Sequence, residues 1–230
     1  CNYYLNYDFS IVLTLLLCLY GIIGTFVSER ETQMDMLLLV SPNGGKKTAL
    51  AKILAATLFL LLTSLWFSLL DLIGFAASFQ TLEGLTLPVF AIPNFAEGSV
   101  NISIFRYVFL SAALKCAGTW VIGMLWLLVS MFWKNALLPF VINFALCIVL
   151  VVSGAACAYS NFFWTKVLNP YSLLTNRVLL GKTEFVNLGG FPVLTWQAAI
   201  WFALIAGLAA AAMIYFLSAE NCHRCVRRAK

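Results

Sequence analysis

Residues 53–79 read ILAATLFLLLTSLWFSLLDLIGFAASF, an apolar run with a single charged residue, Asp71. At ~1.5 Å per residue, a helix of this length covers the ~30 Å hydrocarbon core of a bilayer. A lipid-exposed strand would leave its backbone groups unpaired, whereas a helix pairs them internally. The run therefore predicts a transmembrane helix.

Four further runs of this kind cover residues 9–27, 107–133, 136–159 and 195–217. The 230-residue chain is 63% hydrophobic and only 10% charged, whereas a soluble domain is about 25% charged. A soluble globular enzyme is thereby excluded, and the 15% of aromatic residues excludes a disordered chain. We predict an all-α polytopic membrane protein whose residues 1–230 form one transmembrane domain of five spans.

Lys and Arg in the connections predict the orientation of the spans. Most of them lie in the connection 28–52 and in the tail after residue 217. The positive-inside rule places these two segments in the cytoplasm, in a cell membrane, and Cys1 outside. An outer N-terminus without a signal peptide implies a preceding span, so we expect a parent protein of six spans.

The connection after the first span has its own pattern. Residues 26–47 read FVSERETQMDMLLLVSPNGGKK, with charges first, then five apolar residues, then a helix-breaking turn. Met34, Leu37 and Leu38 stand at helical spacing, which predicts one face of a short amphipathic helix. Such a helix can insert into a groove on a soluble partner; the alternative is an interfacial helix that lies on lipid.

This connection resembles the coupling region of ABC type-2 permeases, the membrane subunits of ATP-driven exporters. Glu31 stands where the family usually has Gly. The matching positions, in chain order, are Phe26, Glu29-Arg30-Glu31, Thr32, Met36-Leu37-Leu38-Leu39, Ser41-Pro42, Lys46 or Lys47, and Lys52.

The resemblance implies that two permease chains, either two copies or two related chains, surround a substrate path and that each docks on a separate cytoplasmic ABC ATPase. It implies no cofactor on this chain, because Mg-ATP would bind to the partner ATPase. For the glutamates, the alternative is a solvated helix start favoured by the helix dipole. The implied ATPase-coupling residues are Glu29, Arg30, Glu31, Met34, Met36, Leu37, Leu38 and Pro42.

Two charged residues lie clearly inside predicted spans, Asp71 and Lys115. Each is about eight residues, or ~12 Å, from the outer end of its span. Equal depth on consecutive antiparallel helices predicts an intramembrane ion pair. The alternatives are that Lys115 extends to the headgroups or that Asp71 lines a substrate path.

Small residues in the last span predict a packing surface. Ala203, Gly207 and Ala211 recur at four-residue spacing, which lets another helix approach closely within the chain or in a dimer. An alanine-rich helix without a special partner is the alternative.

Two outer segments connect the remaining spans. Residues 80–106 contain several prolines and glycines and predict an irregular loop. In residues 160–194, Asn169-Pro170 is a helix start and Gly181 a stop, which predicts a short interfacial helix over residues 170–180. This helix is expected to act either as an exit gate or as a cover without a role.

The sequence offers no catalytic or metal-binding cluster. His223, the one histidine, lies in the tail within Cys222-His223-Arg224-Cys225, which lacks a second ligand pair. Intramembrane hydrolysis would need clustered His, Asp or Glu in the spans. We therefore expect a transporter permease and not an enzyme; the alternative is a non-transporting membrane anchor or assembly protein that docks a cytoplasmic partner.

Overall fold

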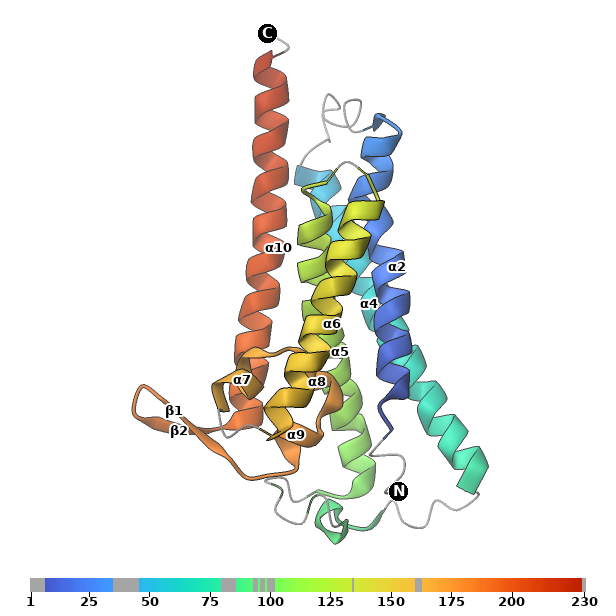
Figure 1. Ribbon diagram of the computed structural model, residues 1–230, viewed down its shortest axis with the longest axis vertical. Coiled ribbons are helices and arrows are strands. Elements are labelled where there is room, and N and C mark those ends of the chain that lie inside the picture. The colour runs from blue at the N-terminus through green and yellow to red at the C-terminus, as the bar shows by residue number, and fades with distance from the viewer. Residues whose placement is uncertain are drawn as a thin grey trace.

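The computed structural model describes residues 7–34, 46–79, 86–92, 95, 98, 102–133, 135–159 and 163–228. Within this part of the chain, five helices are long and apolar enough to cross a membrane. The prediction of an all-α polytopic membrane protein is confirmed (Figure 1). These helices are α2 (Phe9–Glu31), α4 (Lys46–Phe79), α5 (Ile104–Ser130), α6 (Leu137–Tyr159) and α10 (Thr195–Arg228).

Several helices run beyond the predicted spans. α2 continues from residue 27 to Glu31, α4 starts at Lys46 instead of residue 53, and α10 extends past residue 217 to Arg228. Hydropathy marks only the part of a helix that lies in hydrocarbon. Ala, Glu, Lys and Arg are good helix formers, so an established helix continues through them.

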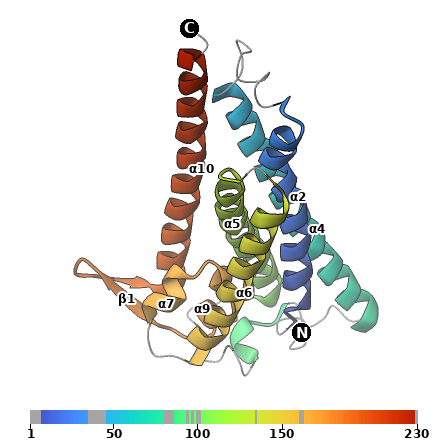
Figure 2. The ribbon, with the colours of Figure 1, turned by 45° about the horizontal axis from the view of Figure 1, so that its top comes forward.

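Helix α5 lies in the middle of the bundle and contacts α2, α4, α6 and α10 (Figures 1 and 2). Gly123 lets α5 pack closely against two of these helices, because a Cβ there would lie 2.4 Å from Leu60 of α4 and 3.1 Å from Ile22 of α2. Around this point the core contains fully buried residues such as Trp126 and Leu127.

The connection between α2 and α4 is described only in part. Met36, Leu37, Leu38 and Pro42 lie outside the described residues, and with them most of the predicted coupling helix. Met34 is described, and its side chain is exposed. We call the end of the bundle that holds residues 28–34 and the start of α4 the coupling end.

At the opposite end, the segment between α4 and α5 is described only in part. Its described part holds a short 3₁₀ helix, η2 (Val89–Ala91), and an isolated bridge between Pro88 and Ser103. We call this end of the bundle the hairpin end, after the strands that follow.

Between α6 and α10 the chain forms three short helices and a hairpin. They are α7 (Phe163–Leu168), α8 (Tyr171–Thr175), α9 (Arg177–Leu180), β1 (Phe185–Leu188) and β2 (Phe191–Leu194). The helix expected over 170–180 is therefore divided, and Asn176, with φ 53°, separates its two parts. The hairpin was not predicted, although Gly189-Gly190 between two short apolar runs is a typical hairpin signal.

Helix α8 is buried, whereas an interfacial position was expected. Asn169 directs it inward, because its amide donates to the Leu150 carbonyl of α6 (3.1 Å) and its Oδ1 accepts from the Tyr171 backbone (3.0 Å). Gly118 of α5 provides the space, since a Cβ there would lie 3.2 Å from Leu173 and from Leu174. The segment thus fills space between the spans.

Candidate functional site

The two charges inside the spans face each other at the hairpin end. Nζ of Lys115 on α5 lies 3.8 Å from Oδ2 of Asp71 on α4, and the side chains are 18% and 11% exposed. This distance exceeds that of a hydrogen bond, so the contact is ionic. The structure therefore brings together the two residues that the sequence paired.

A third helix completes the surroundings of Asp71. Ser10 of α2 donates a hydrogen bond of 2.5 Å from its Oγ to Asp71 Oδ2. The Asp71 carboxylate, on α4, thus contacts a hydroxyl from α2 and an ammonium from α5. A buried charge needs such partners because it has lost its water. Sequence reasoning missed Ser10, since a lone serine near a helix start has no distinctive spacing.

A small cavity adjoins this ion pair. Its polar lining comprises Lys115 and the hydroxyl-bearing residues Ser10, Thr14, Ser64 and Ser68, and Leu174 of α8 lies on its wall. The space is sufficient for about one water molecule. In this conformation the site can hold a water between hydroxyls and an ammonium, but not an organic substrate.

A second ion pair links α9 to the start of α2. Arg177 Nη2 donates to Asp8 Oδ2 at 3.0 Å, although the two residues are 169 positions apart in sequence. Burial raises the pKa of Asp8 above its ordinary value, and it outweighs the opposing charges of Arg177 and Lys115. The pair connects the segment 163–194, whose helix α8 is buried, to the same helix that supplies Ser10.

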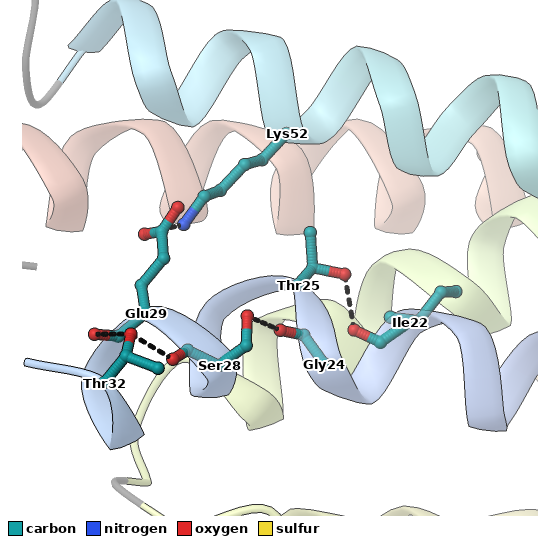
Figure 3. Close-up of polar contacts among 7 residues, drawn as sticks. All are labelled: Ile22, Gly24, Thr25, Ser28, Glu29, Thr32 and Lys52. Atoms are coloured by element: carbon teal, nitrogen blue, oxygen red, sulfur yellow. Dashed lines mark hydrogen bonds and ion pairs between the residues drawn. The ribbon is translucent and has the colours of Figure 1, made fainter. Parts of the chain in front are cut away.

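The coupling end holds another ion pair, between α2 and α4. The Glu29 carboxylate contacts the Lys52 ammonium, as Figure 3 shows, with side-chain exposures of 28% and 12%. The same ammonium lies 4.2 Å from the centre of the Phe26 ring, a cation–π geometry. Lys52 is therefore held by two residues one turn apart on α2.

The hydroxyl groups nearby do not compete for this pair. Ser28 donates to the Gly24 carbonyl at 2.6 Å, Thr25 to Ile22 at 2.5 Å, and Thr32 to Ser28 at 2.8 Å (Figure 3). All of these bonds run along the surface of α2 itself. Glu29 is thus the residue in this group that reaches across to α4.

The next two residues contact the connection between α5 and α6. Arg30 Nη1 donates to the Trp133 carbonyl at 3.0 Å, and Glu31 Oε1 accepts from the Ala136 backbone N–H at 2.9 Å. Glu29, Arg30 and Glu31 together join the end of α2 to two other parts of the bundle; we call these three residues the α2 clamp. The sequence indicated the three charges but not their partners; those of Arg30 and Glu31 lie more than 100 positions away.

The small residues of α10 pack within the chain. A Cβ on Gly207 would lie 2.4 Å from the Trp120 ring of α5, and Ala203 is buried. Ala211 packs against the same core. Packing within the chain agrees with this geometry, in which Gly207 lies against α5.

Among the residues with described side chains, no group of three or more His, Cys, Asp or Glu could hold a metal ion. The side chains of the tail around His223 lie outside that set. Comparisons of the chain with protein-family models and with curated proteins each found no match. Proposals about its function therefore depend on the geometry above and on the sequence pattern of the connection 28–52.

Proposed function

We propose that the chain is the permease subunit of an ATP-driven ABC exporter and that its connection 28–52 couples it to a separate ATPase. One observation carries the proposal. The α2 clamp, which ends four residues before the apolar stretch 36–40, binds α4 through Lys52 and the α5–α6 connection through Trp133 and Ala136. A partner that moves this connection would therefore move three spans together.

The charged groups of the clamp are suited to passing a movement of the connection on to the other helices. Charged hydrogen bonds are stronger than neutral ones and fix direction as well as distance. A charge that interacted with water alone would not tie one helix to another. Beside the clamp, the Lys52 ammonium also stacks on the Phe26 ring.

The proposal extends to the partners and the membrane. Mg-ATP would bind and be hydrolysed on the cytoplasmic ABC ATPase, and this chain would carry out no bond chemistry. A second permease, either a copy or a related chain, would complete the substrate path. The coupling end would face the cytoplasm of a cell membrane, as the positive charges of 28–52 favour.

The test is purification of the tagged protein, co-expressed with its neighbouring genes, followed by a vanadate-sensitive ATPase assay. We expect an ATPase to co-purify with the wild type and to be lost from the Leu37→Asp/Leu38→Asp variant. As a matched control, Leu13→Ala/Leu17→Ala on the exposed apolar face of α2 should leave the ATPase bound, because these side chains lie in the span and not in the connection 28–52.

The variant Glu29→Gln separates docking of the ATPase from the transmission of its movement to the spans. It leaves the apolar anchors in place and removes the ion pair to Lys52. We expect the ATPase to co-purify but its activity to respond less to the permease. A clean, folded wild-type preparation without any ATPase would contradict the exporter proposal and favour a membrane anchor that docks another cytoplasmic partner.

A further inference from the structure

The hairpin β1–β2 is a well-defined element at the hairpin end of the bundle. Val186 pairs with Val193 and Leu188 with Phe191 in antiparallel register. The turn uses Gly189 and Gly190, with φ of 62° and 99°, which other residues rarely adopt. The Asn187 Oδ1 accepts from the Gly190 N–H at 2.9 Å, so the tip has a fixed shape.

Ion-pair and backbone contacts fix the base of the hairpin to the bundle. Glu184, just before β1, accepts from Lys166 of α7 at 2.8 and 3.0 Å. Its carbonyl also accepts from the backbone and the hydroxyl of Thr195, the first residue of α10, at 3.1 and 2.7 Å. The hairpin therefore keeps its direction relative to α7 and α10.

The two faces of the hairpin differ. Side chains alternate along a strand, so Val186, Leu188, Phe191 and Val193 share one face. At the base this face packs on the bundle: Val186 is fully buried, against Val167 of α7 and Ala198 of α10. At the tip the same face extends past the bundle, and Phe191 is 75% exposed.

The exposed part of this face lies at the end of the bundle where an exposed apolar surface of α10 begins. Both views show the hairpin projecting sideways from the bundle where α10 begins (Figures 1 and 2). The packed face turns toward α7 and α10, and therefore back toward the spans. Along α10, the residues Trp201, Ile205 and Leu208 form an exposed apolar surface that begins beside the hairpin.

We propose that the hairpin is a membrane-interface anchor and that Phe191 inserts at the boundary between headgroups and acyl chains of the adjacent leaflet. Apolar side chains of interfacial elements are buried about 5–10 Å at this boundary. Asn187, on the opposite face next to the tip, would then point away from the membrane, and Phe185, 60% exposed, shares its face at the base of the hairpin. The anchor holds the segment 163–194 at constant depth and does not depend on the transport activity proposed above.

Photocrosslinking in membrane vesicles that contain the full-length protein tests this anchor. Phe191→benzoylphenylalanine and, as the matched control, Asn187→benzoylphenylalanine are irradiated, and the adducts are identified by mass spectrometry. We expect several-fold more phospholipid adduct from position 191 than from position 187. Where the Phe191 variant fails to accumulate, Leu188→benzoylphenylalanine tests the same face.

Two results would overturn the anchor. One is a crosslink from position 191 to a second copy of the chain or to another protein, which would make the face a protein interface. The other is equal or absent lipid adduct at both positions, which would place the tip in water. Either result leaves the ATPase assay unaffected, so failure of the anchor and failure of the exporter proposal can be told apart.

Discussion

The two ends of the bundle use similar chemistry in different surroundings. At the hairpin end, Asp71 and Lys115 face each other inside their spans, at 11% and 18% exposure. At the coupling end, Glu29 and Lys52 meet near the end of α2, at 28% and 12% exposure. Water can replace a lost partner at the end of a helix, but much less readily inside a membrane span.

This difference in exposure indicates how much each ion pair contributes to the stability of the protein. Removing one partner of a buried pair leaves a charge without compensation, so the first pair maintains the arrangement of α2, α4 and α5. Pairs near water contribute little to stability. The α2 clamp can therefore break and re-form at small cost, which the proposed coupling to an ATPase would need.

The largest expected loss of stability is at the buried pair of Asp71 and Lys115. Asp71→Asn leaves the Lys115 ammonium without its carboxylate and should destabilise the protein by about 3–5 kcal/mol. The measurement is the loss of folded protein in a detergent titration followed by size-exclusion chromatography.

The control is the double variant Asp71→Asn/Lys115→Gln, which removes both charges. Residues in direct contact are not additive, so the double variant should lose less than the sum of the single variants. Additive losses would mean that the two side chains act independently. The ion pair at the hairpin end would then not stabilise the bundle as a pair.

Glycine substitutions compare packing at the two ends. A Cβ at Gly118 would lie 3.2 Å from Leu173, Leu174 and the Pro170 carbonyl oxygen. Gly118→Val should therefore cost about 1–3 kcal/mol through overpacking. A Cβ at Gly24, toward the coupling end, has no neighbour within 4 Å, so Gly24→Val should change stability by only about 0.5 kcal/mol. Thermal unfolding in the same detergent measures both, and equal shifts would contradict the burial of α8.

The third prediction concerns the Glu29–Lys52 pair. Glu29→Gln should cost about 1 kcal/mol or less, because the pair lies near water. In the same unfolding assay it should resemble the wild type far more than Asp71→Asn does. A loss as large as that of Asp71→Asn would show that the two ends are equally dependent on their ion pairs.

The smallest effect is a pH dependence at the hairpin end. Burial raises the pKa of Asp8 above its ordinary 3.8, so the folded protein holds this proton to higher pH than the unfolded chain does. Its stabilising contribution is complete below pH 3.8 and is lost as the pH rises through the raised pKa. Asp8→Asn lacks this titration, so the difference in melting temperature between the two proteins should change with pH in that window and be constant above it.

Some features of the protein follow from local patterns in the chain. Bilayer thickness and helix rise convert each apolar run into a span, and all five expected spans correspond to helices. Equal depth was sufficient to pair Asp71 with Lys115. These predictions succeed because depth in a membrane depends on one helix at a time.

The remaining features depend on the lateral packing of the helices. Lipid is as apolar as a leucine side chain, so hydropathy does not specify which helix face contacts which neighbour. Ser10 on Asp71, Arg177 on Asp8, and the attachment of Arg30 and Glu31 to residues 133 and 136 all join distant positions. The burial of α8 and the exposure of Phe191 likewise depend on the finished bundle, because each is defined by what neighbouring helices cover.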